Sequence, residues 1–221
     1  YFDRLVDDVF FEGYDRVVFC GADSCGYAAA AFSVVSPGAT VITMSPQATL
    51  DPSVAQWDDR FLHKRRTCFT DRYGYAPDML EAAAHAFVIY DPEVEPDAMH
   101  AALFHGSNIS RIRFRHLGGQ VDTFLNRMEL LAPLVSRAMA GRLTVADFYA
   151  AYRERRNYLP YLRMFLGAVQ QAERPFLSAM LCTSVLSRMN VPRFRQQLNA
   201  STKELQAAGK ALPRAVALQS A

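Results

Sequence analysis

The sequence lacks the features that mark a secreted or membrane-spanning chain. No apolar stretch reaches the roughly 18 to 20 residues that a bilayer-crossing helix needs, and no signal peptide stands at its start. The cysteines form no Cys-x-x-Cys pair and no metal-like spacing; they are Cys20, Cys25, Cys68 and Cys182. We therefore expect reduced thiols in a cytoplasmic protein with no membrane partner.

The sequence also lacks a large net charge. A net charge of +2 over 221 residues gives no reason to expect a nucleic-acid partner. The run Lys64-Arg65-Arg66 is typical of a solvated face. His100 and His105 lie five positions apart with no carboxylate pattern behind them, so we expect neither a metal site nor a cofactor.

What the sequence does contain is an alternation of strand-like and helix-like segments. Short apolar runs predict strands, and segments with helical spacing lie between them. This alternation predicts an α/β fold, a parallel sheet with crossover helices. The expected strands are 16–20, 40–44, 87–90 and 109–114, and the expected helices are 2–11, 27–35, 77–85, 97–104 and 121–139, with a loop over 45–59.

Beyond Gly141 the pattern becomes entirely helical. We expect an α/β domain over 1–141, a helical region over 142–208 and a weakly structured tail over 209–221. Aromatic and leucine side chains recur at helical spacing there, which favours a packed helical core and leaves a protein-binding surface as the alternative. The expected helices are 145–155, 161–171, 175–189 and 192–206.

The most informative segment is the turn Gly21-Ala22-Asp23-Ser24-Cys25-Gly26 between the first strand and its helix. Such a turn can present one side chain above the sheet edge and aim N–H groups at the same point. The five-residue turn can be placed in two registers. If it begins at Gly21, the presented residue is Asp23. If it begins at Ala22, the presented residue is Ser24. A third interpretation makes Asp23 a simple helix cap.

These residues resemble a bacterial α/β-hydrolase family whose nucleophile turn reads Gly-x-Ser-Met-Gly-Gly-Tyr. The similarity spans roughly residues 14 to 140, and in it the nucleophilic serine is replaced by Asp23 and the following glycine by Cys25. Because the chain starts at Tyr1, we expect the hydrolase-like part to be incomplete at its N-terminus. The matching residues are Gly21, Gly26, Tyr27, Ala28, Ser45-Pro46-Gln47, Asp51-Pro52 and Arg60.

The resemblance also implies where an acid and a histidine should lie. Asp91 follows the third strand as the acid of many hydrolases does, and Asp97 with His100 resembles the Asp-x-x-His-Ala element of the particular family. Gln120 stands where that family has its histidine, and glutamine cannot act as a general base. His116, four residues earlier, reaches such a site only if the loop is rearranged.

These substitutions predict a hydrolase-like protein with altered catalytic positions. We expect it to be inactive or weak as a serine hydrolase and to bind a small molecule at the Gly21–Gly26 turn. One alternative is a hydrolase that uses Asp23 as nucleophile. Another is a nucleotide-binding enzyme, since Gly21-Ala22-Asp23-Ser24 is similar to the pyrophosphate loop of phosphoadenosine phosphosulfate reductases.

Overall fold

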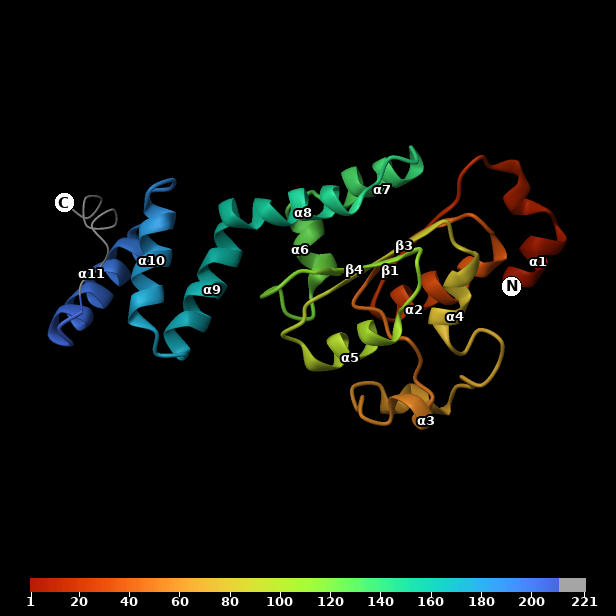
Figure 1. Ribbon diagram of the computed structural model, residues 1–221, viewed down its shortest axis with the longest axis horizontal. Helices are drawn as coiled ribbons and strands as arrows, with labels where there is room; N and C mark the ends of the chain where they lie inside the picture. Colours follow the sequence, from red (N-terminus) through yellow and green to blue (C-terminus); the bar gives the residue numbers. More distant parts are fainter. Residues whose placement is uncertain (211–221) are drawn as a thin grey trace. The chain divides into compact units, whose positions relative to one another are not determined.

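The centre of the molecule is a four-stranded sheet, shown in a computed structural model that describes residues 1–210 apart from the side chain of Arg65 (Figure 1). All neighbouring strands are parallel and their order in the sheet follows their order in the chain. The predicted parallel sheet is therefore confirmed. Its strands are β1 (Val18–Ala22), β2 (Thr40–Met44), β3 (His85–Tyr90) and β4 (Ile109–Arg113).

The first strand lies later than its apolar pattern predicts. It ends at Ala22 instead of Cys20, because Gly21 and Ala22 continue the ladder and pair with Thr43 and Met44 of β2. Small residues lower strand propensity without preventing pairing, so the apolar run alone misplaced this end of the strand.

The helices around the sheet are shorter and more numerous than the expected ones. The single helix expected over 121–139 is divided because Glu129 has a left-handed φ of 57°. The helix expected over 77–85 ends early, since β3 begins at His85, and Asp51 caps a short helix inside the expected loop over 45–59. The α-helices are α1 (Phe2–Asp7), α2 (Asp23–Ala31), α3 (Pro52–Ala55), α4 (Ala76–Met79), α5 (Glu95–Leu103), α6 (Val121–Arg127), α7 (Leu131–Met139) and α8 (Val145–Arg153), with 3-10 turns over Phe10–Gly13, Ser33–Val35, Leu62–Arg66 and Leu80–Ala82.

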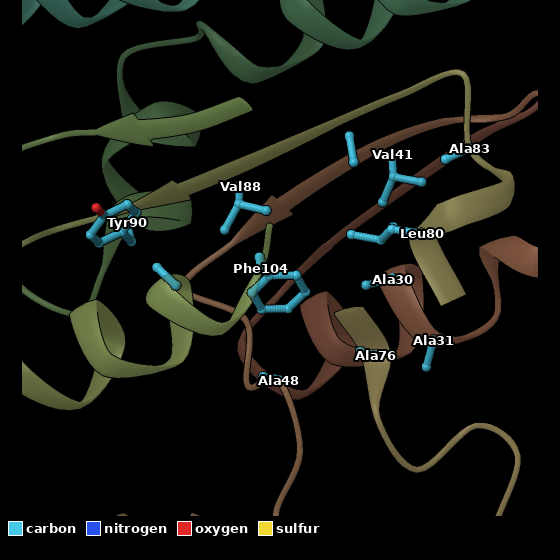
Figure 2. Close-up of a cluster of buried hydrophobic side chains, with 12 residues drawn as sticks. Ala30, Ala31, Val41, Ala48, Ala76, Leu80, Ala83, Val88, Tyr90 and Phe104 are labelled. Atoms are coloured by element: carbon cyan, nitrogen blue, oxygen red, sulfur yellow. The ribbon is translucent and has the colours of Figure 1, made fainter. Parts of the chain in front are cut away.

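Helices cover both faces of the sheet (Figure 1). On one face Val41 and Val88 point toward α2, α4 and the end of α5, where Leu80 and Phe104 complete a buried core (Figure 2). The opposite face is covered by α7 and α8. Burial on both faces explains why the central strands read as continuous apolar runs.

The chain divides into two compact units later than its sequence pattern indicates. The first unit is Tyr1–Arg153, and the second begins at Glu154. The first unit extends past Gly141 because Phe148 of α8 is fully buried and its ring lies 4.9 Å from that of Phe87 in β3. The helix α8 therefore belongs to the core of the α/β unit.

The second unit is helical, as expected. Helix α9 (Leu159–Gln171) follows a 3-10 turn over Glu154–Asn157, and α10 (Pro175–Leu186) and α11 (Pro192–Ala207) alternate in direction with it (Figure 1). The side chains of Tyr161, Leu162 and Leu166 in α9 are buried. The tail expected over 209–221 lies almost wholly outside the described residues. Within residues 1–210, no helix is long and apolar enough to cross a membrane.

Candidate functional site

The turn after β1 is conformationally strained at its first helical residue. Asp23 has a φ of 50°, a left-handed value that few non-glycine residues adopt. A Cβ at Gly21 would lie 2.2 Å from the carbonyl oxygen of Cys25, so the turn closes only with glycine there. Although β1 runs further than expected, Asp23 and not Ser24 takes the strained position.

The Asp23 carboxylate lies in an electrostatic environment that disfavours its charge. Its pKa is raised, first by partial burial and then by the neighbouring carboxylates of Asp122 and Asp97. Arg60 and Lys64 act in the opposite direction without cancelling the shift. The turn therefore presents a carboxyl group whose proton is held more tightly than usual.

Ser24 faces a different group. Its hydroxyl oxygen accepts a hydrogen bond from the ammonium group of Lys64, which lies on the 3-10 turn Leu62–Arg66. The serine hydroxyl is thus directed at a cation, and a cation cannot remove the proton that a serine nucleophile must lose.

Asp91 directly follows β3, and its carboxylate holds the loop after β4 in place through hydrogen bonds. Its Oδ2 accepts the backbone N–H groups of Leu117 and Gly118, each at 2.7 Å, and its Oδ1 accepts that of Glu93 at 3.0 Å. The residue is completely buried. Three acceptor positions of about four on the carboxylate are in use, so Asp91 fixes the loop that carries His116.

Asp97 belongs to a cluster centred on the guanidinium group of Arg60, whose side chain is 31% exposed while the side chains of Asp58 and Asp97 are buried. Arg60 donates to Oδ1 of Asp97 at 2.7 Å and to both oxygens of Asp58 at 3.0 and 2.8 Å. His100 contacts Oδ2 of Asp58 through Nε2 at 2.9 Å and accepts the N–H of Ala48 at Nδ1. We call Asp58, Arg60, Asp97 and His100 the Arg60 cluster.

Protonation in the Arg60 cluster follows from these contacts. Because Nδ1 of His100 accepts a hydrogen bond, Nε2 carries the proton and donates it to Asp58. Burial lowers the pKa of His100 against the opposing effect of Asp58, which favours this neutral form. Burial would raise the pKa of Asp58, but hydrogen bonds from Arg60 and His100 outweigh it and hold that pKa at about 2. The cluster therefore links the loop after β2 to α5.

The loop after β4 carries both remaining candidates. His116 is exposed and has a left-handed φ of 62°. Gln120 is exposed and precedes α6 at its N-cap without a capping hydrogen bond from its side chain. The candidates thus divide into a turn with Asp23 and Ser24, a loop anchor at Asp91, a cluster containing Asp97, and two exposed loop residues.

A cavity of about 360 Å³ opens beside Ser24. Lys64 and Gln47 contribute polar groups to it, and most of the remaining wall is aromatic or aliphatic. Gln47 is only 2% exposed, yet its Nε2 has no hydrogen-bond partner among the described residues. We call this the Lys64 cavity; its lining includes Ser24, Tyr27, Gln47, Lys64, Phe69 and Tyr73.

Sequence reasoning missed four residues that shape these sites. Asp58 is the partner of both Arg60 and His100, Asp122 raises the pKa of Asp23, and Gln47 and Lys64 line the cavity. The run Lys64-Arg65-Arg66 predicts a solvated face and gives no sign of the contact with Ser24. The one local signal was the presence of Asp58 two residues before Arg60, because a guanidinium group forms strong hydrogen bonds with a nearby carboxylate.

Comparison with known proteins adds no relative. No family model, no curated protein and no solved structure matches this chain.

Proposed function

We propose that this chain is a hydrolase-like protein that lacks serine-hydrolase activity and binds a small molecule at the carboxyl edge of its sheet. The observation that carries the proposal is the left-handed φ of Asp23. It supports a turn that presents a carboxylate where a serine hydrolase presents a hydroxyl group. The adjacent Ser24 is hydrogen-bonded to Lys64 and faces the cavity.

The other catalytic positions support the same proposal. Asp91 uses most of its acceptor capacity on backbone N–H groups, and Gln120 has no titratable group. Loss of a general base typically costs about a hundredfold or more in rate. Ester hydrolysis by this site should therefore be close to the uncatalysed background.

An aspartate-based hydrolase is the second candidate, and the same strained position of Asp23 favours it. In such an enzyme the carboxylate displaces a halide or opens an epoxide to form an ester, and a base-activated water molecule then cleaves that ester. The raised pKa of Asp23 would make its carboxylate more basic than an ordinary aspartate. This candidate requires His116 to act as the base that activates the water molecule in the second step.

A nucleotide-reductase function has less support. The strand β1 ends at Ala22 and α2 begins at Asp23, so no loop of successive N–H groups intervenes to cradle a phosphate. The thiol of Cys182, the one cysteine of the C-terminal helices, is buried in α10, and burial raises its pKa to about 11. Such a thiol is inert.

Ester and haloalkane turnover tests the proposal. We expect p-nitrophenyl butyrate hydrolysis by the wild-type chain to equal that of Ser24→Ala, Asp23→Asn and His116→Ala, with all four near background. Turnover abolished by Ser24→Ala alone would contradict the proposal. Dehalogenation of 1-bromohexane that is lost in Asp23→Asn and His116→Ala but kept in Ser24→Ala would establish the aspartate-based enzyme instead.

A further inference from the structure

Three of the residues that line the Lys64 cavity carry hydrogen-bond donors, namely Ser24, Gln47 and Lys64. Gln47 follows β2, Ser24 lies in the first turn of α2, and Lys64 lies on a 3-10 turn, so three separate elements contribute to it. Elements distant in sequence that converge on one cavity are typical of a preformed ligand site.

Gln47 provides the observation that points to a ligand. Its side chain is almost completely buried, it lines the cavity, and its Nε2 has no partner within residues 1–210. Buried polar groups in folded proteins are nearly always hydrogen-bonded. Because Gln47 lines the cavity, an acceptor atom of a bound ligand is a candidate partner for this amide group.

The Lys64–Ser24 hydrogen bond sets what kind of atom that acceptor should be. The hydroxyl oxygen of Ser24 accepts from the ammonium group, so the hydroxyl proton remains available for donation. The ammonium group has two further protons. A group that only accepts hydrogen bonds and carries negative charge therefore suits these donors best.

The rest of the wall suits an apolar body. The hydroxyl of Tyr27 donates to the carbonyl oxygen of Tyr73 at 2.6 Å, and the Tyr27 ring meets that of Phe69 edge-on at 5.7 Å. These contacts hold the aromatic rings in place around the cavity. Asp71 also lines it, but this residue is exposed and its carboxylate accepts the N–H of Arg72.

We propose that the Lys64 cavity binds a small carboxylic acid with an aromatic or aliphatic body. The carboxylate lies against Lys64, Ser24 and Nε2 of Gln47, and the body packs among Tyr27, Phe69 and the other apolar side chains. This inference deepens the proposed function by naming the class of small molecule that the chain binds, and it rests on that proposal.

Calorimetric titration with three probes of one shape tests the charge requirement. The probes are 4-phenylbutanoate, the neutral 4-phenylbutanamide and the cationic 4-phenylbutylamine. We expect the acid to bind at least tenfold more tightly than the amide and the amine not to bind. Equal affinity for acid and amide, preference for the amine, or absence of binding by all three would overturn the proposal.

Two variants locate the site, and a third serves as control. Gln47→Met and Lys64→Met should each weaken 4-phenylbutanoate binding about tenfold, the loss expected for one charge-assisted or buried hydrogen bond. Lys203→Met removes an exposed lysine of α11 and should leave binding unchanged. Undiminished binding in both cavity variants would overturn the proposal, and the probe comparison in the wild-type chain decides it if a variant fails to fold.

The alkylation rate of Cys68 reports whether a ligand occupies the Lys64 cavity. It lines the cavity, and a hydrogen bond from Thr70 lowers the pKa of its thiol, so it should react readily with iodoacetamide. Saturating 4-phenylbutanoate should slow alkylation of Cys68 but not of the exposed Cys25, as resolved by mass spectrometry. Equal rates with and without the acid would contradict binding in this cavity.

The two proposals can fail separately. Ester turnover lost in Ser24→Ala would contradict the absence of serine hydrolysis, whatever binds the cavity. Binding of the acid is measured without any substrate, so its failure would leave the turnover result intact.

Discussion

The Arg60 cluster and the Lys64 cavity are both polar sites beside the same sheet, but they differ in how far the protein satisfies them. In the cluster, Arg60, both oxygens of Asp58 and both nitrogens of His100 have partners. Oδ2 of Asp97 is buried without a partner among the described residues, yet its carboxylate is neutralised by Arg60. In the cavity, the donor of Gln47 is left open.

This difference predicts that the Arg60 cluster contributes to folding stability and that the Lys64 cavity serves ligand binding. A buried group that is satisfied from within contributes to folding, whereas an unsatisfied donor costs about 1–3 kcal/mol of folding free energy. Proteins retain such costs where function requires them. We therefore expect loss of a charge in the cluster to destabilise the chain and removal of the unpartnered amide of Gln47 to stabilise it.

The largest effect should come from removing the cation of the Arg60 cluster. Arg60→Met leaves the buried carboxylates of Asp58 and Asp97 without their counter-ion, and because the Arg60 side chain is itself 31% exposed we expect a loss of about 2–3 kcal/mol in the free energy of unfolding. Urea denaturation measures it. The control is Arg4→Met, because the Arg4–Asp8 pair has side chains 85% and 62% exposed and should contribute less than about 0.5 kcal/mol. A loss below 1 kcal/mol at Arg60 would mean that the cluster is not a stabilising network.

Acid should weaken the same cluster in two stages. The folded-state pKa of His100 is lowered, so the unfolded chain takes up that proton first and stability falls as the pH drops below about 6.5. The folded-state pKa of Asp58 is about 2. Its contribution of about 2 kcal/mol, fully present above the unfolded value, is lost as the pH falls from about 3.8 towards 2.

The variant His100→Gln tests whether protonation of His100 causes the first loss of stability. Glutamine does not titrate, so the decline that begins near pH 6.5 should disappear while the lower stage remains. The other four histidines are exposed. If the upper stage persisted in His100→Gln, its origin would lie at one of those residues and not in the cluster.

A smaller effect of opposite sign is expected in the Lys64 cavity. Gln47→Met keeps the length of the side chain and removes the unpartnered Nε2, so the ligand-free chain should gain about 1 kcal/mol of stability. Thermal unfolding without any added acid measures this gain. A loss of more than 1 kcal/mol would show that Gln47 is satisfied from within, and the contrast between the two sites would not hold.

The sequence predicts the sheet well because its information is local. Each strand is a short apolar run, and β2 begins and ends at the expected residues Thr40 and Met44. The division after Glu129 and the assignment of α8 to the first unit depend on a left-handed residue and on one distant contact, Phe148 with Phe87. Neither leaves a periodic signal in the sequence.

The candidate site shows the same limit more sharply. The turn at Gly21 was recognisable because close backbone approach requires glycine. The role of Asp91 as a loop anchor depends on backbone N–H groups of Leu117 and Gly118, which any residue supplies. The partnership of Lys64 with Ser24 joins residues forty positions apart. Such contacts are properties of the fold and cannot be read from spacing.

The smallest predicted effect concerns Asp23, whose carboxylate interacts electrostatically with residues of both sites. Asp97 and Arg60 of the cluster and Lys64 of the cavity all influence its pKa, which burial and Asp122 raise. A raised carboxyl pKa means that the charged form is less stable in the folded protein, so its contribution opposes folding above the ordinary value of 3.8. Asparagine has nearly the same shape and tolerates a left-handed φ equally well.

We therefore expect Asp23→Asn to stabilise the chain at pH 7 by less than about 1 kcal/mol, a small value because the side chain is exposed and partly screened. The gain should vanish when both proteins are compared below pH 3.8, where the aspartate is protonated in either state. Urea denaturation at the two pH values measures it, and Asp15→Asn, at an exposed position before β1, is the matched control. Destabilisation at pH 7 would mean that Arg60 and Lys64 outweigh burial, which would place Asp23 among the satisfied groups of the Arg60 cluster.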